Sequence, residues 1–361
     1  MRLVVDLVTG REPPKYTREI IARLSKEVDC RVISSRSYAR TRIGVLYRLL
    51  AHGRHIRRQR RNGGILHVDS LLLADVLSRR QTPPRVVTVH DVVPFLREFD
   101  DPSYVRRDRW VDGLLYRALD HGLHSADRIL AISEFVRTDL KRFGIDSNLV
   151  DVVPMGVDHS TYRPMDRAEC LPVLRKYGIA GMPVVLYVGT EHPRKNLEGL
   201  LRAFGHVRRE YGRSVLVKVG PPRHPQHEAI LRLGSLLGLT DHVVTLDRVA
   251  ESDLPLLYGA ADVLVLPSFY EGFGLPPLEA MACGTPAAVS NVTSLPEVVG
   301  HAGILFNPHD ERDIADAVLR ILHDPELRTE LRDRGIARAR EFTWERTVRG
   351  LLDTYEKASQ R

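Results

Sequence analysis

Two glutamates in one short stretch have the type and spacing needed to bind the hydroxyl groups of a sugar or a ribose. Glu271 and Glu279 have seven residues between them, within the segment Leu264–Ala287 (LVLPSFYEGFGLPPLEAMACGTPA). The segment predicts a strand, a loop and a helix, with Glu271 in the loop and Glu279 about two turns further on. Because carboxylates accept hydrogen bonds from hydroxyl groups, we expect both side chains to contact one ligand. The alternative is an ordinary strand–helix turn with a surface glutamate and a helix glutamate.

The residues around these glutamates predict an anion site at the start of the same helix. Pro276 and Pro277 fit a first helical turn, and Gly284 fits the position after the last one. The free backbone N–H groups and partial positive charge at a helix start suit a diphosphate. Gly272 and Gly274 would let the backbone approach such a ligand closely.

Two further places in the sequence have residues suited to the same ligand. Arg194 and Lys195 lie between an apolar run, 184–188, and a helix expected over 197–210, where cations can neutralise a diphosphate. His90 follows the apolar run 86–89, and the carboxyl end of a parallel strand is where α/β sheets bind ligands. The alternatives are solvated surface cations and a histidine with a structural role.

The elements that must position these residues alternate between strand and helix along the whole chain. Short apolar runs predict strands, and stretches with apolar residues at helical spacing lie between them; the runs include 3–7, 30–34, 65–68, 86–89, 184–188, 215–219 and 263–266. Such alternation is typical of an α/β fold with parallel sheets. The polar, turn-rich string PMGVDHSTYRP, residues 154–164, predicts a linker between two domains.

Four strings together resemble the retaining glycosyltransferases of family GT4, in the mannosyltransferase-like subgroup with an HD-x-x-P segment. They are VTVHDVVPF, PMGVDHSTYRP, HPRKN and FYEGFGLPPLEAMACGTP, and the last one contains an E-x7-E motif. The resemblance covers nearly the whole chain. It implies the GT-B fold, an α/β architecture of two Rossmann-like domains facing across a cleft. The expected division is an acceptor domain over residues 1–158, a donor domain over 159–341, and a C-terminal helix over 342–361 that returns to the first domain.

The resemblance also implies a role for individual residues. A nucleotide-sugar donor would lie mostly against the second domain, with Glu279 on the ribose and Glu271 orienting the sugar. Arg194 and Lys195 would stabilise the leaving phosphate, and His90 would face the sugar from the first domain. The implied catalytic residues are therefore His90, Glu271, Arg194 and Lys195, and the implied donor-binding residues are Gly10, Thr190, Val249, Phe273, Gly274, Leu275 and Glu279.

The chain departs from the family pattern at two of these positions. The loop after the first strand keeps Gly10 but has Pro13 and Pro14 where family members usually have a second glycine. Thr190 stands where many members have an arginine directly after a glycine. Either Arg194 supplies that charge or the phosphate site has one cation fewer.

Composition limits the remaining choices. The 361 residues suffice for two domains, and an apolar content of 43% is ordinary for a globular protein. No run of about eighteen apolar residues predicts a membrane span, and the first residues indicate a strand rather than a signal peptide. The three cysteines have neither metal nor disulfide spacing, and we expect them to be reduced and buried in a cytoplasmic protein. No D-x-D follows a strand, so a metal-independent reaction is expected.

The net charge of +7 is concentrated in one block. The segment Cys30–His67 has ten arginines and no acidic residue, and residues 38–61 predict a basic amphipathic helix. Such a helix suits an anionic membrane surface or a phosphorylated acceptor, although a solvated helix face explains it equally well. The candidate contacts with membrane or acceptor are Arg54, Arg57, Arg58, Arg106 and Arg107.

Several functions stay open at this point. A nucleotide- or NAD-dependent enzyme is disfavoured because no G-x-G-x-x-G follows the first strand. A nucleic-acid-binding protein is disfavoured because the arginine block lacks interleaved aromatic residues. Within the glycosyltransferase interpretation, GDP-mannose is the first expectation for the donor and UDP-glucose or a related UDP-sugar the next. The acceptor is a glycan or a lipid-linked saccharide, or else a small soluble molecule.

Overall fold

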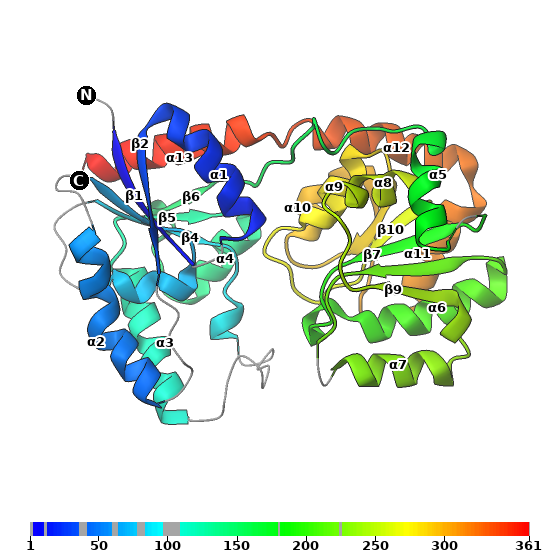
Figure 1. The fold of residues 1–361 in the computed structure, drawn as a ribbon, viewed down its shortest axis with the longest axis horizontal. Coiled ribbons are helices and arrows are strands. Elements are labelled where there is room, and N and C mark those ends of the chain that lie inside the picture. The colour runs from blue at the N-terminus through cyan, green and yellow to red at the C-terminus, as the bar shows by residue number, and fades with distance from the viewer. Residues whose placement is uncertain are drawn as a thin grey trace. The chain divides into compact units, whose positions relative to one another are not determined.

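The computed structural model describes residues 3–10, 13–35, 42–59, 64–77, 84–96, 109–179, 181–223 and 226–360. The chain forms two compact units (Figure 1): unit 1 comprises Met1–Gly156 and Trp344–Arg361, and unit 2 comprises Val157–Thr343. Over the described residues, each unit contains a six-stranded sheet in which all paired strands are parallel. The expected α/β architecture is confirmed.

The sheet of unit 1 has the strand order β2-β1-β3-β4-β5-β6. Its strands are β1 (Val4–Thr9), β2 (Asp29–Ser34), β3 (Ile65–Val68), β4 (Arg85–Val89), β5 (Arg128–Ala131) and β6 (Val150–Val152). The inner strands are almost entirely buried and mainly apolar, as expected for a parallel sheet covered on both faces. From β1 the chain continues to β2 on one side, and from β3 it continues to β4, β5 and β6 on the other side. The loops that follow β1 and β3 therefore run in opposite directions.

The helices of unit 1 are α1 (Lys15–Glu27), α2 (Arg42–Gln59), α3 (Arg109–His124), α4 (Glu134–Arg142) and α13 (Trp344–Ser359). The last helix packs beside α1, although more than 300 residues separate them in the sequence (Figure 1). The Tyr355 hydroxyl of α13 lies 2.7 Å from Nδ1 of His67, whose Nε2 lies 2.8 Å from the Thr88 hydroxyl. Burial, and then the neighbouring His90, lower the pKa of His67 to about 3, so the ring is a neutral hydrogen-bonding link between helix and sheet.

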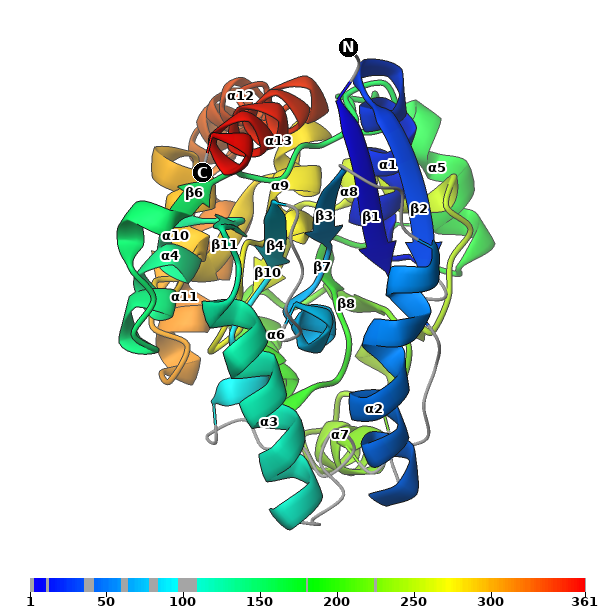
Figure 2. The ribbon, with the colours of Figure 1, turned by 90° about the vertical axis from the view of Figure 1, so that its left-hand side faces the viewer.

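The described part of unit 1 also contains the 3₁₀ turns η1 (Leu71–Val76), η2 (Val93–Phe95) and η4 (Ser147–Leu149). η1 lies between α2 and α3 (Figure 2). Asp75 of η1 binds α2 through Arg48, with Nη2 at 2.6 Å, and through His52, with Nδ1 at 3.0 Å. Nε2 of His52 then lies 3.0 Å from the Ser35 hydroxyl at the end of β2. This buried polar chain fixes the basic helix to the sheet.

The sheet of unit 2 has the strand order β12-β11-β10-β7-β8-β9. Its strands are β7 (Val184–Val188), β8 (Val215–Val219), β9 (Val243–Leu246), β10 (Val263–Leu266), β11 (Ala287–Ser290) and β12 (Gly303–Phe306). In this order the chain runs outward from β7 in one direction and then outward from β10 in the other. The two strands are neighbours in the register Val263 with Val185 and Leu264 with Leu186. Loops leaving adjacent strands in opposite directions form the crevice in which such sheets bind ligands.

The helices of unit 2 cover its sheet and connect its strands. They are α5 (Arg167–Lys176), α6 (Leu197–Tyr211), α7 (Gln226–Leu236), α8 (Asp253–Ala260), α9 (Leu275–Ala282), α10 (Leu295–Val299), α11 (Glu311–His323) and α12 (Pro325–Ala339), with 3₁₀ turns η5 (Pro193–Lys195), η6 (Thr240–His242) and η7 (Gly300–Ala302). The helix expected after Leu266 is present as α9, with prolines in its first turn.

Two expectations about local structure need correction. The sequence after β9 predicts a helix over residues 251–259, but α8 begins two residues later, at Asp253, following a turn at residues 251–252. The cysteines are all free, but only Cys170 and Cys283 are buried. Cys30 is half-buried because it lies on β2, the edge strand of its sheet. The sequence pattern could not show which strand would be at the edge.

Candidate active site

The site in unit 2 is built from the loops that follow β7 and β10. The β7 loop contains Arg194 and Lys195 in η5, and the β10 loop contains Ser268 and Glu271. The backbone N–H of Phe269 donates to the Arg194 carbonyl at 2.8 Å, which ties the two loops together. Residues 76 apart in the sequence therefore meet at the point where the strand order reverses.

Glu271 is the centre of this site and is 6% exposed. The Lys195 ammonium donates to Oε1 at 2.6 Å, and the Ser268 hydroxyl donates to the same oxygen at 2.7 Å. The Arg194 guanidinium donates to Oε2 at 3.2 Å and also to the carbonyl of Tyr270 at 2.7 Å. The sequence predicted a role at the sugar for Glu271 and a role at the phosphate for the two cations. The structure places all three side chains in direct contact.

The charge state of Glu271 follows from these neighbours. Burial acts to raise the pKa of the Glu271 carboxyl, but the positive charges of Lys195 and Arg194 and the hydrogen bonds from Lys195 and Ser268 outweigh it. The resulting pKa is about 2, so Glu271 is an anion throughout the neutral range. A carboxylate in this state accepts hydrogen bonds and does not donate protons.

The turn that presents the cations is held by its own side chains. His192 Nδ1 accepts the backbone N–H of Arg194 at 3.2 Å. Asn196 adopts a left-handed conformation, with φ of 54°, and caps α6 by accepting the N–H of Gly199 at 3.2 Å. Its amide also donates to the Pro308 carbonyl at 2.7 Å. These contacts explain why the PRKN string ends in an asparagine, which tolerates this conformation better than most residues.

The start of α9 lies directly after Glu271 in the chain. Gly274 has φ of 120°, and a Cβ there would lie 2.8 Å from Cδ2 of Leu295, so only glycine fits. The Ser294 hydroxyl lies 2.9 Å from the Glu271 carbonyl and 2.6 Å from the Phe273 carbonyl, which fixes the loop. Within the described residues, no side chain caps this helix start. Because Pro276 and Pro277 have no N–H, the backbone N–H groups that suit an anion are those of Phe273, Gly274 and Leu275.

Glu279 lies inside α9 and is 7% exposed. The Tyr258 hydroxyl of α8 donates to its Oε2 at 3.0 Å. Among the other implied donor residues, Phe273 and Gly274 are buried. Thr190 is exposed, and its carbonyl accepts the Tyr187 hydroxyl at 2.8 Å. Val249 is half-buried after β9, and Gly10 is half-buried at the end of β1 in unit 1.

His90 lies at the end of β4 in unit 1 and is half-buried. Its Nε2 lies 2.9 Å from the carbonyl oxygen of Asp69, and its ring packs edge-on against Tyr16 with 4.9 Å between centroids. Because a carbonyl only accepts, Nε2 carries the proton. Burial lowers the pKa of His90, more than the opposing charge of Asp69 raises it. The ring is thus neutral, with Nδ1 available as an acceptor.

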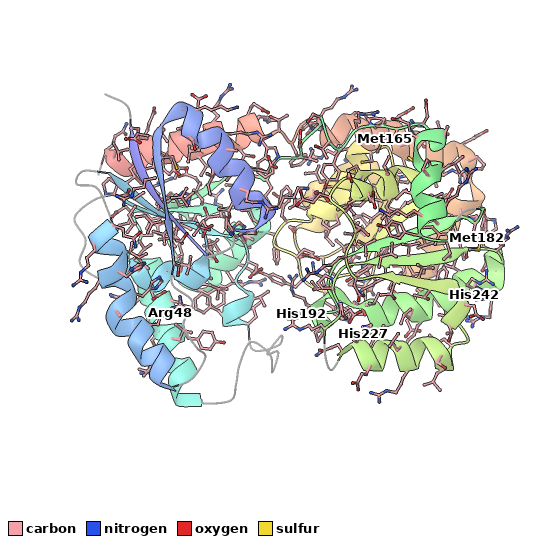
Figure 3. The ribbon with its side chains drawn as sticks, in the orientation of Figure 1. Arg48, Met165, Met182, His192, His227 and His242 are labelled. Carbon is pink, nitrogen blue, oxygen red and sulfur yellow. The ribbon has the colours of Figure 1, made fainter. Side chains whose placement is uncertain are left out.

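A second buried ion pair includes Glu191 of the same β7 loop and was not expected from the sequence. Lys218 of β8 is 2% exposed, and its ammonium lies 2.7 Å from Oε1 of Glu191 in the β7 loop. Glu191 Oε2 also accepts the Arg223 N–H at 2.8 Å, and His227 Nδ1 lies 3.0 Å from Oε1. His192 and His227 lie at one end of unit 2, opposite Met182 and His242 (Figure 3). The sequence feature that could have predicted this ion pair is Lys218 inside the apolar run VLVKV. A lysine buried in a strand needs a buried anion as its partner.

The expected basic contacts are only partly described. Arg54 and Arg58 of α2 are exposed, whereas Arg106, Arg107 and the side chain of Arg57 lie outside the described residues. In the part of the chain that the structure covers, no group of three or more His, Cys, Asp or Glu side chains is placed to hold a metal ion. None of the described helices is both long and apolar enough to cross a bilayer.

Two known protein families match the chain, each over a different segment. The family model described as "Glycosyl transferases group 1" matches residues 174–338, and "Glycosyltransferase Family 4" matches residues 3–161. O-antigen chain mannosyltransferase B of Escherichia coli is 38% identical over 274 residues, which cover 75% of this chain and 70% of that protein. The chain belongs to the group 1 glycosyltransferases. The resemblance to family GT4 is confirmed, and with it the expectation of an enzyme.

Other relatives of this group 1 glycosyltransferase are longer proteins. D-inositol 3-phosphate glycosyltransferase of Nocardia farcinica is 36% identical over 64% of this chain and 53% of its own length. Serotype-specific mannosyltransferase WbdA of Escherichia coli is 32% identical over 81% of this chain but only 36% of its own length. The chain thus spans about half of the first protein and about a third of the second.

Solved structures confirm the GT-B fold of this group 1 glycosyltransferase. Sucrose-phosphate synthase of Thermosynechococcus elongatus superposes with a TM-score of 0.80 at 22% identity, covering 99% of both chains. Anabaena HepE, solved in complex with UDP and glucose, superposes with a TM-score of 0.78 at 18% identity, covering 99% of this chain and all of that one. At these identities the likeness concerns the fold alone.

Proposed function

We propose that this group 1 glycosyltransferase moves a hexose, with mannose as the first choice, from a nucleoside diphosphate sugar to a glycan or a lipid-linked saccharide. The observation that carries the proposal is the buried, ionised Glu271 held between Lys195 and Arg194 at the switch point of the unit 2 sheet. The mannosyltransferase relatives support the choice of sugar and acceptor class.

The chemical demand is departure of a nucleoside diphosphate from the anomeric carbon. Negative charge grows on the leaving phosphate as the C1–O bond breaks. Lys195, Arg194 and the backbone N–H groups around Phe273, Gly274 and Leu275 would stabilise it. The acceptor oxygen bonds to C1 from the same face, and its proton passes to the leaving phosphate, so configuration is retained. Glu271, already an anion, would accept hydrogen bonds from the sugar rather than attack it. Glu279 would accept from the ribose.

The role proposed for His90 follows from its tautomer. A neutral ring that donates through Nε2 to Asp69 has Nδ1 left as an acceptor. We therefore assign His90 a hydrogen bond from a hydroxyl of the donor sugar and no proton transfer. The expected outcome for His90→Ala is a loss in turnover rather than a change in the pH at which turnover is highest.

Metal independence is part of the proposal. The two cations at Glu271 supply the positive charge that a divalent ion would otherwise provide to the diphosphate. Dialysis of the enzyme against EDTA should change activity by less than about twofold, because the loss of even one such stabilising contact costs about 10²-fold or more. Activity that disappears with EDTA and returns with Mg²⁺ or Mn²⁺ would contradict metal independence.

The donor is tested by thermal shift with GDP, UDP, ADP, dTDP and NAD. A ligand at 100 times its Kd stabilises the folded state by about 2.7 kcal/mol, which should raise the melting temperature by several degrees. We expect GDP to stabilise the wild type and to lose most of this effect in Glu279→Ala. Stabilisation by NAD alone, or by no nucleotide, would overturn the proposed function.

A second candidate is transfer from a UDP-sugar to a small soluble acceptor. It is favoured by the relatives named D-inositol 3-phosphate glycosyltransferase, which are 36% identical to this chain. UDP as the stabilising nucleotide in the same panel would favour this candidate over the first. Activity on soluble acceptors without vesicles would then separate the acceptor classes.

We further propose that α2 contacts an anionic membrane surface, which would bring a lipid-linked acceptor to the enzyme. Arg54 and Arg58 are exposed on this helix, and each basic residue near such a surface contributes about 1 kcal/mol. Arg54→Glu/Arg58→Glu should reduce co-sedimentation with phosphatidylglycerol vesicles by at least about tenfold. Arg334→Glu/Arg340→Glu, which makes the same charge change on exposed residues of unit 2, is the matched control and should bind normally. Equal losses in both variants would mean non-specific attraction to net charge.

A further inference from the structure

Glu279 differs from Glu271 in the groups that hold it. Glu271 is held by two cations, whereas the hydrogen bonds described at Glu279 come from tyrosine hydroxyls. Tyr258 donates to Oε2 at 3.0 Å, and the hydroxyl of Tyr162 also hydrogen-bonds the carboxylate. The two rings pack at 62° with 6.0 Å between centroids, and both are buried.

The chemistry of these partners matters for what Glu279 can bind. A phenol hydroxyl orients a carboxylate without neutralising its charge, and a carboxylate has about four acceptor positions on its two oxygens. The tyrosine hydroxyls therefore fix the direction in which the Glu279 oxygens face and leave the carboxylate its charge. Burial and the negative charge of Glu279 raise the pKa of both Tyr162 and Tyr258 far above neutral, so both hydroxyls remain donors.

Tyr162 belongs to the segment where the chain enters unit 2. Val157 at its start donates its N–H to the Phe342 carbonyl at 3.2 Å, and the Tyr162 N–H donates to the Asp158 carbonyl at 2.8 Å. The Asp158 carboxylate also accepts the hydroxyls of Ser160 and Thr161, both at 2.7 Å. The segment is therefore a closed turn that places the Tyr162 ring at a fixed position beside α8 and α9.

We propose that Tyr162 and Tyr258 are positioning residues that set the enzyme's preference for a ribose over a deoxyribose in the donor nucleotide. They hold the Glu279 carboxylate in the orientation in which it accepts hydrogen bonds from the hydroxyls of the ribose. The inference rests on the proposed function, in which a nucleoside diphosphate binds at the start of α9. It adds Tyr162 and Tyr258 to the proposed binding site. It also identifies the ribose hydroxyl as the feature of the nucleotide that these residues select.

The test is the ratio of dissociation constants for 2′-deoxy-GDP and GDP, measured by calorimetry, with 2′-deoxy-UDP and UDP in parallel. One hydrogen bond to a charged group corresponds to a preference of about tenfold for the ribose form. Tyr258→Phe and Tyr162→Phe keep the ring and remove only the hydroxyl. Each should reduce the ratio several-fold, and the double variant should bring it close to one, mainly by weakening binding of the ribose form.

Tyr177→Phe is the matched control, because the Tyr177 hydroxyl also donates to a carboxylate of unit 2, Asp253, at 2.7 Å. It should leave the ratio unchanged. A double variant that keeps the wild-type ratio, or that weakens both nucleotides equally, would overturn the inference, since a purely structural role lowers both affinities together. Failure of the wild type to bind any nucleoside diphosphate would instead overturn the proposed function, and the inference with it.

Discussion

Replacing Lys195 by alanine should reduce turnover by about 10²–10³-fold while the enzyme stays folded. The Lys195 side chain is 12% exposed, and its ammonium lies 2.6 Å from Oε1 of Glu271, so its charge acts in a largely dehydrated site. In the proposed reaction this charge stabilises the leaving phosphate more strongly in the transition state than in the ground state. Single-turnover rates with saturating donor, together with the melting temperature, would separate a chemical loss from a folding loss.

Lys176→Ala is a matched control for this experiment. Lys176 also lies 2.6 Å from a carboxylate, that of Asp253, but its side chain is 56% exposed. Loss of a solvent-exposed pair costs little, so turnover should remain within about twofold of the wild type. Full activity in Lys195→Ala would show that the cation has no part in the chemistry and would leave Arg194 as the phosphate ligand.

Replacing Glu271 by glutamine should weaken unit 2 strongly at neutral pH and remove part of its acid sensitivity. The pKa of Glu271 is about 2 in the folded protein, against 4.5 for an unperturbed glutamate, so the ionised form stabilises the fold. The difference corresponds to about 3 kcal/mol, present above pH 4.5 and lost as the pH falls toward 2. The glutamine variant lacks this contribution at every pH.

Urea unfolding at pH 7, 5, 4 and 3 would measure the effect of Glu271→Gln. The gap in unfolding free energy between wild type and variant should be several kcal/mol at pH 7, because two buried cations lose their anion. It should narrow by about 2 kcal/mol by pH 3. The double variant Glu271→Gln/Lys195→Met should regain stability at pH 7, since it removes one of those cations. A gap that does not change with pH would contradict the assigned charge state.

The positions of the strands along the chain were predictable because parallel sheets are buried on both faces. Such strands are short apolar runs in the sequence, for example VLVL in β10 and VVLYV in β7. Helix ends were predictable where proline or glycine marks them, as at α9. The boundary of α8 and the exposure of Cys30 were not, because they depend on a turn and on sheet-edge position rather than on local pattern.

The site was predictable as a set of residues but not as a set of contacts. Glu271, Arg194 and Lys195 were identified from two strings, yet their mutual ion pairs depend on β7 and β10 being neighbours in the sheet. The Lys218–Glu191 pair and the tyrosines at Glu279 were missed for the same reason. A contact between residues far apart in the sequence leaves no periodic signal in either segment.

The return of α13 to unit 1 has a consequence for biosynthesis. Residues 344–359 are made only after the whole of unit 2, yet their apolar face packs on the sheet of unit 1, with Leu351 and Tyr355 fully buried. At about 5–20 residues per second the ribosome needs on the order of ten seconds or more to synthesise the intervening unit. During that time the nascent N-terminal unit lacks the helix that covers β4, β5 and β6. A chaperone that binds apolar surface would therefore be expected to bind unit 1 at this stage. Unit 1 begins to emerge before unit 2 but is completed only after it.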